Sequence, residues 1–87
     1  MPTIFIFFGL RFVFFSNDHE PIHVHVIRGK TTELAVFQVL PDVKLLKNTG
    51  IASHELKMAE AIIEENKEVI IEAWNTFFNR NDHGRHA

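Results

Sequence analysis

The spacing of the apolar residues changes at Ser53, and this change limits the fold more than any other feature of the chain. After Ser53 apolar residues recur at intervals of three and four, which is the period of a helix with one buried face. The pattern predicts one amphipathic helix from about His54 to Phe78, with Ser53 as its N-cap. Its apolar stripe consists of Leu56, Ala59, Ile62, Ile63, Val69, Ile70, Ala73, Trp74 and Phe77.

The first half of the chain has the residue types of β-strands. Strands are expected over residues 3–8, 11–15, 22–28 and 33–40, while 43–46 is either a short fifth strand or an irregular cover. Gly9-Leu10 predicts a type II′ hairpin turn, because Gly9 can take a positive φ. The expected fold class is therefore α+β, with a mainly antiparallel sheet of about four strands packed on one long C-terminal helix.

Bulk composition narrows the class of protein. The 87 residues make one small domain, expected over residues 1–79, with a polar and disordered tail over 80–87. A net charge of −2 argues against a DNA-binding module, and the lack of cysteine excludes disulfides and thiolate metal sites. The apolar run 4–10 lacks a preceding basic region and is too short to span a membrane, so a cytoplasmic protein is expected.

Three histidines and two carboxylates fall within eight residues: Asp18, His19, Glu20, His23 and His25. Successive side chains on a strand point to opposite faces, so His23 and His25 should share one face. Two neighbouring imidazoles can bind a metal ion, transfer a proton or bind a phosphate. The spacing alone does not select among these roles.

Three interpretations of His23 and His25 remain open. They could hold zinc, nickel or non-haem iron, with a further ligand from His19, Asp18 or Glu20. They could also act as a catalytic acid–base pair in RNA cleavage, with His19 as a third candidate catalytic residue. In the third interpretation their role is purely structural: the two rings cover part of the sheet and form hydrogen bonds with the helix or the backbone.

Five other residues are candidate binding residues: Asp18, Glu20, Arg28, Lys30 and Asn66. The two carboxylates either orient the imidazoles or cap a turn. Arg28 and Lys30 either contact phosphate in an RNA site or lie in a solvated turn. Asn66 interrupts the apolar stripe of the helix, and facing the sheet it would reach the histidine strand.

The chain resembles the DUF4160 family of small bacterial domains of unknown function. The likeness is carried by the phenylalanine-rich hairpin, by Glu20-Pro21-x-His23-x-His25 and by the helix ending in Ala73-Trp74-Asn75. It extends from Met1 to about Phe78. The resemblance implies a cytoplasmic bacterial protein that is often encoded beside a second small protein, as in toxin–antitoxin-like pairs.

Two positions depart from the family pattern. Ile22 stands where members often have a second proline, and Asn66 stands where some relatives carry a helix histidine. The resemblance therefore does not carry a three-histidine site over to this chain.

The expected function is that of a component of a toxin–antitoxin-like pair. Such a protein would bind a small partner protein, or a second copy of itself, through the apolar strands, and RNA through the His23/His25 strand. The alternative is a metal-binding protein or a metal-free histidine-dependent hydrolase such as a ribonuclease. No cofactor is expected apart from a divalent metal in that alternative, and neither a membrane nor DNA is an expected partner.

Overall fold

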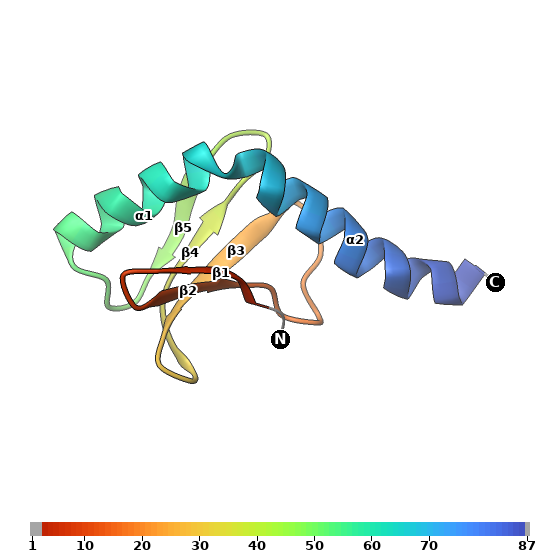
Figure 1. Cartoon of the computed structure of the whole chain (residues 1–87), viewed down its shortest axis with the longest axis horizontal. Coiled ribbons are helices and arrows are strands. Elements are labelled where there is room, and N and C mark those ends of the chain that lie inside the picture. Colours follow the sequence, from red (N-terminus) through yellow and green to blue (C-terminus); the bar gives the residue numbers. More distant parts are fainter. Residues whose placement is uncertain (1–2, 87) are drawn as a thin grey trace.

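The structure is a computed structural model that describes residues 3–86, with the side chains of residues 3–78. A five-stranded antiparallel sheet is covered on one face by two consecutive helices (Figure 1). The predicted α+β class and the antiparallel sheet are confirmed. The sheet has one strand more than the four or so expected, and the single long helix is divided in two.

The strands follow one another across the sheet in chain order. They are β1 (Thr3–Phe7), β2 (Leu10–Val13), β3 (His23–Arg28), β4 (Thr32–Gln38) and β5 (Lys44–Asn48). This order leaves β1 and β5 as the two edges. The two edges differ in chemistry, because β5 carries two lysines and β1 carries no charge.

The turn between β1 and β2 lies one residue earlier than predicted. Phe7 pairs with Leu10, so the two turn residues are Phe8 and Gly9, with φ of 51° and 77°. Two positive φ angles define a type I′ turn rather than the expected type II′. The twist of the flanking strands favours this turn, although it forces a bulky residue into the left-handed region.

The helical region consists of α1 (Ser53–Glu65) and α2 (Lys67–His86), which are separated by Asn66. Asn66 leaves helical geometry, with φ −110° and ψ 21°, and its Nδ2 donates to the Ile62 carbonyl at 2.8 Å. A side-chain amide that bonds to the preceding turn competes with regular helix geometry, which accounts for the break. The N-cap is Ala52, without a side-chain bond, so the prediction of Ser53 at this position was wrong.

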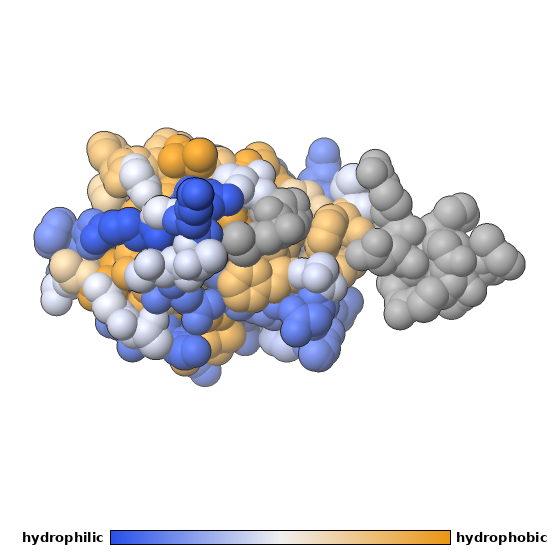
Figure 2. Space-filling model, turned by 90° about the horizontal axis from the view of Figure 1, so that it is seen from below, coloured by the Kyte–Doolittle hydropathy of each residue, from blue (hydrophilic) through white to orange (hydrophobic). Residues whose placement is uncertain are grey.

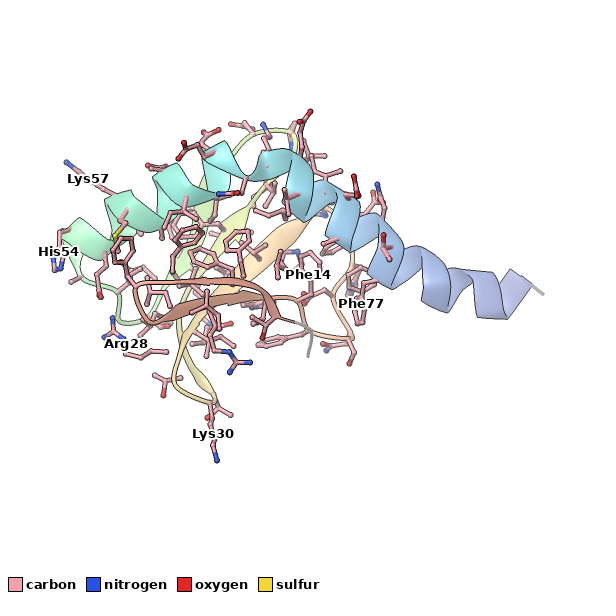
Figure 3. The ribbon with its side chains drawn as sticks, in the orientation of Figure 1. Phe14, Arg28, Lys30, His54, Lys57 and Phe77 are labelled. Carbon is pink, nitrogen blue, oxygen red and sulfur yellow. The ribbon has the colours of Figure 1, made fainter. Side chains whose placement is uncertain are left out.

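The main core lies between the sheet and the helices. Its fully buried members include Phe12, Phe37 and Ile63, and Phe14 packs edge-on against Trp74 with ring centroids 5.2 Å apart. Figure 3 shows Phe14 between the strands and α2. The helices thus cover one face of the sheet, and within the described residues no helix lies on the other face.

The face away from the helices is buried in part by its own side chains. Val13, Ile27 and Val36 are 8% exposed or less, yet they do not belong to the core under the helices. Figure 2 views the molecule from below, with hydrophilic side chains across the middle and a hydrophobic band along the β1 edge.

No helix of the described residues is both long enough and apolar enough to cross a membrane. The helix was predicted to end at about Phe78, whereas α2 continues to His86. The side chains of residues 79–87 lie outside the described part, and the disorder predicted over residues 80–87 remains a prediction.

Candidate functional site

His23 and His25 project from the same side of β3, as their spacing predicted. Their ring centroids are 5.2 Å apart, and their side chains are only 16% and 10% exposed. The position is near the start of β3, where the loop from β2 passes close to α2 (Figure 1). Two imidazoles are therefore held next to each other with little contact with solvent.

Both rings point their Nε2 atoms at Asp18. Its Oδ1 lies 3.2 Å from Nε2 of His23 and 3.1 Å from Nε2 of His25, and its Oδ2 lies 3.2 Å from the second ring. The Asp18 side chain is 7% exposed. One carboxylate thus bridges the two histidines.

A tight turn holds Asp18 in this position. The Phe15 N–H donates to Oδ2 at 2.9 Å, and the Asp18 N–H donates to the Phe15 carbonyl at 3.0 Å. One oxygen of Asp18 therefore caps the turn, and the carboxylate faces the Nε2 atoms of both imidazoles. Phe15 also stacks on His25, and Trp74 of α2 lies 5.6 Å from the His23 ring between centroids.

The opposite nitrogen of each ring also has a partner. Nδ1 of His23 lies 2.9 Å from the carbonyl oxygen of Pro21. Nδ1 of His25 lies 2.6 Å from Oε1 of Glu33, whose Oε2 lies 3.4 Å from Nζ of Lys47. The Pro21 carbonyl can only accept, so Nδ1 of His23 is the donor. Both ring nitrogens of His25 face carboxylates, and the shorter contact, 2.6 Å to Glu33 against 3.1 Å to Asp18, favours Nδ1 as the donor there too.

The hydrogen bonds of the two Nδ1 atoms determine whether the Nε2 atoms carry a hydrogen or a lone pair. When Nδ1 carries the hydrogen of a neutral imidazole, Nε2 presents a lone pair. Two such lone pairs and the Asp18 oxygens would then face one another across 3.1–3.2 Å and repel. A proton or a metal ion between these atoms would relieve this repulsion.

The ligand atoms of Asp18, His23 and His25 all lie within 4.8 Å of one another. Ligands 2.0–2.1 Å from a tetrahedral metal are about 3.3 Å apart, so two of the three separations already match. Among the described residues, no other group of three histidine, cysteine or carboxylate side chains meets this spacing.

His19 and Glu20 lie outside the cluster. The His19 side chain is exposed in the loop. Glu20 lines an open surface pocket of about 590 Å³ together with Pro21, Ile22, Leu40 and Pro41. Of the three loop residues predicted to supply a metal ligand or a catalytic group, only Asp18 contacts the strand histidines within the described part of the chain.

The two basic candidates lie at the other end of β3. Arg28 forms an ion pair with Glu55 of α1, and Lys30 is in the turn that leads to β4. In Figure 3 Lys30 points away from the body of the protein at the far end of this turn. Neither residue shares the end of the strand that carries His23 and His25.

Asn66 is half-buried, and its amide is bonded to the helix break. Among the described residues, no hydrogen bond joins it to either strand histidine. The Asn66 side chain instead donates a hydrogen bond to the Ile62 carbonyl at the break between α1 and α2.

Sequence reasoning did not find Glu33, Lys47, Phe15 or Trp74 as parts of the site. Glu33 and Lys47 lie 8 and 22 positions after His25, and no motif connects them to it. Only the pairing of three strands brings them together.

The fold and the cluster define a small α+β protein with a carboxylate-bridged histidine pair on one sheet face. The family model described as "Domain of unknown function (DUF4160)" matches residues 9–75, and the chain belongs to this family. Comparison with curated proteins gives no match, and comparison with solved structures gives none either.

Proposed function

We propose that this protein binds a divalent transition-metal ion through Asp18, His23 and His25. The observation that supports the proposal is the convergence of both Nε2 atoms on one carboxylate, with each Nδ1 already engaged by an acceptor. Histidines that ligate metals usually donate their other ring N–H to a carboxylate or a backbone carbonyl. His25 and His23 use one of each.

The donor set favours particular metals. Two imidazole nitrogens and one carboxylate oxygen suit zinc, nickel or ferrous iron rather than the all-oxygen sites of magnesium and calcium. Two histidines and one carboxylate also form the facial triad of non-haem iron proteins.

Three protein ligands leave at least one coordination position free. Structural zinc sites are closed by four protein ligands, whereas catalytic sites keep a position for water or substrate. A metal bound here would hold a water molecule and make it more acidic, which is the basis of metal-assisted hydrolysis. The proposed class of reaction is therefore hydrolysis, and RNA is one candidate substrate.

The metal-free alternative uses the same histidines as an acid–base pair. That chemistry needs ring nitrogens that reach a substrate. Here both Nε2 atoms face Asp18 and both Nδ1 atoms are engaged within the protein. The geometry therefore favours the metal site.

A second candidate function is partner binding in a toxin–antitoxin-like pair, and a separate observation supports it. Ile6, Phe7 and Phe8 are 61%, 39% and 76% exposed at the free edge of the sheet. We call these three residues the hairpin tip. Exposed apolar patches at a sheet edge are typical of interaction surfaces. Co-expression with the product of the neighbouring gene should give a stable complex, and a monomer that ignores that product would count against this role.

Metal analysis of protein purified without a tag tests the main proposal. We expect one equivalent of bound metal after zinc or cobalt is added and the excess removed, and a clear loss in Asp18→Ala and His25→Ala. His19→Ala is the matched control, since it removes a histidine from the same loop outside the cluster. Less than one equivalent in the native sequence, or equal binding in His25→Ala, would refute the proposal.

A further inference from the structure

On the face of the sheet that carries the two histidines, three side chains form a line of contacts leading to Asp18. Nζ of Lys47 lies 3.4 Å from Oε2 of Glu33, Oε1 of Glu33 lies 2.6 Å from Nδ1 of His25, and Nε2 of His25 lies 3.1 Å from Asp18. Each oxygen of the Glu33 carboxylate thus has its own partner. The line runs from β5 across β4 to the candidate metal site on β3.

A β-bulge places Glu33 on this face. His25 pairs with Val36 and Val26 with Ala35, but the next pair is Ile27 with Glu33, so Leu34 is an extra residue in β4. Without that extra residue, Glu33 would pair with Arg28, whose side chain reaches α1 on the other face. Because side chains alternate along a strand, the bulge turns Glu33 toward His25.

A second bulge does the same for Lys47. Phe37 pairs with Leu45, but the next pair is Val36 with Lys47, which leaves Leu46 as the extra residue in β5. Uninterrupted pairing would set Lys47 opposite Ala35, which belongs to the core under the helices. Bulges that redirect a side chain are frequent next to functional sites.

We propose that Glu33 is the positioning residue of this site. It holds His25 with Nδ1 protonated and Nε2 free for a metal, and the bulge at Leu34 turns Glu33 toward His25. The inference rests on the metal site proposed above. His23 receives the same support from the Pro21 carbonyl, which no side-chain substitution removes. Among the described residues, Glu33 is therefore the side chain that bonds to the Nδ1 of a proposed ligand histidine.

Glu33 and Lys47 should differ in how much they contribute to metal affinity. Glu33 is 23% exposed and makes a short bond to a nearly buried ring, whereas Lys47 is 58% exposed. Removing an outer partner of a ligand histidine typically weakens metal binding about 10–100-fold. An exposed ion pair contributes little, so loss of Lys47 should change affinity less than about 5-fold.

Cobalt titration and nitrogen NMR of the histidine rings test the role of Glu33 together. We expect Glu33→Ala to weaken cobalt binding about 10–100-fold and to shift His25 of the metal-free protein from the Nδ1–H form. Glu33→Gln should retain that form and most of the affinity, because the amide oxygen still accepts the bond. Glu55→Gln is the matched control, since Glu55 is also ion-paired but lies on the helix side.

The outcomes separate the two proposals. If the native sequence binds no cobalt while Glu33→Ala still changes the His25 ring form, the metal site is wrong and the control of His25 by Glu33 stands. If the native sequence binds cobalt and Glu33→Ala leaves both affinity and ring form unchanged, the positioning role is wrong and the metal site stands. An equal effect of Glu55→Gln would also overturn the positioning role.

Discussion

Phe15 lies almost flat on the imidazole of His25, with ring centroids 3.8 Å apart and an angle of 24° between the planes. The backbone N–H of Phe15 also donates to the carboxylate of Asp18. Phe15, two residues beyond the end of β2, therefore positions two of the three proposed ligands, one through its ring and one through its backbone.

Replacing Phe15 with leucine separates these two contributions. Phe15→Leu keeps the backbone bond and loses the stack, and an aromatic pair contributes about 0.5–1.5 kcal/mol beyond the area it buries. We expect a loss of stability of this order in urea denaturation and a several-fold weaker cobalt affinity. Phe77→Leu, on α2 (Figure 3), should affect stability alone. Unchanged cobalt affinity in Phe15→Leu would mean that the stack does not support the site.

Metal binding should stabilise the fold, because the ligands join the β2–β3 loop to β3. A ligand at 100 times its dissociation constant adds about 2.7 kcal/mol. For a domain of this size each kcal/mol raises Tm by about 4–8 °C, so a rise of roughly 10–20 °C is expected. A thermal scan with zinc and then with a chelator measures it. His54→Ala should keep the shift and His23→Ala should lose it, and a shift retained in His23→Ala would contradict the assigned ligands.

The same stabilisation should depend on pH in one direction. A ligand imidazole must be neutral, so protons compete with the metal and binding weakens as pH falls. The zinc-induced rise in Tm should therefore shrink between pH 7 and pH 5. The metal-free protein scanned over the same range is the reference. A zinc shift that is as large at pH 5 as at pH 7 would argue against histidine ligands.

The sequence predicts the fold class because each half of the chain has a clear period. It does not predict the bulges at Leu34 and Leu46, since one extra residue leaves the composition of a strand unchanged. Their effect is large, because a shift of one residue exchanges the two faces for all that follows. Glu33 and Lys47 could therefore not be assigned to the histidine face from alternation alone.

The site was predictable where it depends on local spacing. His23 and His25 share a face because they are two positions apart on a strand. Asp18 was a candidate without a fixed role, because a loop has no regular repeat from which the direction of its side chains can be predicted. The sequence showed that Asn66 interrupts the apolar stripe of the helix. It did not show that the Asn66 side chain hydrogen-bonds to the preceding helical turn rather than to the histidine strand.

Asn66→Ala tests whether this residue serves the helix or the site. Alanine favours the helix by up to about 0.7 kcal/mol, while the lost bond to Ile62 costs about 0.5–1.5 kcal/mol. These terms nearly cancel, so stability in urea should change by less than about 1 kcal/mol. Cobalt affinity should stay the same. A loss of cobalt binding in a folded Asn66→Ala protein would return Asn66 to the list of site residues.

Phe8 has a strained backbone and an exposed ring, so the isolated protein gains little from it. A residue other than glycine in the left-handed region costs roughly 1–2 kcal/mol, whereas asparagine tolerates it and is preferred before glycine in type I′ turns. Phe8→Asn should therefore stabilise the protein by about 1 kcal/mol in urea denaturation. Leu46→Asn is the control, because Leu46 is 50% exposed at the other edge and has no positive φ. An equal gain in stability from Leu46→Asn would disprove the strain at Phe8.

If the hairpin tip binds a partner, Phe8→Asn should also weaken that complex, because the exposed ring would be part of the contact surface. A complex that forms equally well with Phe8→Asn would show that the hairpin tip is not that surface.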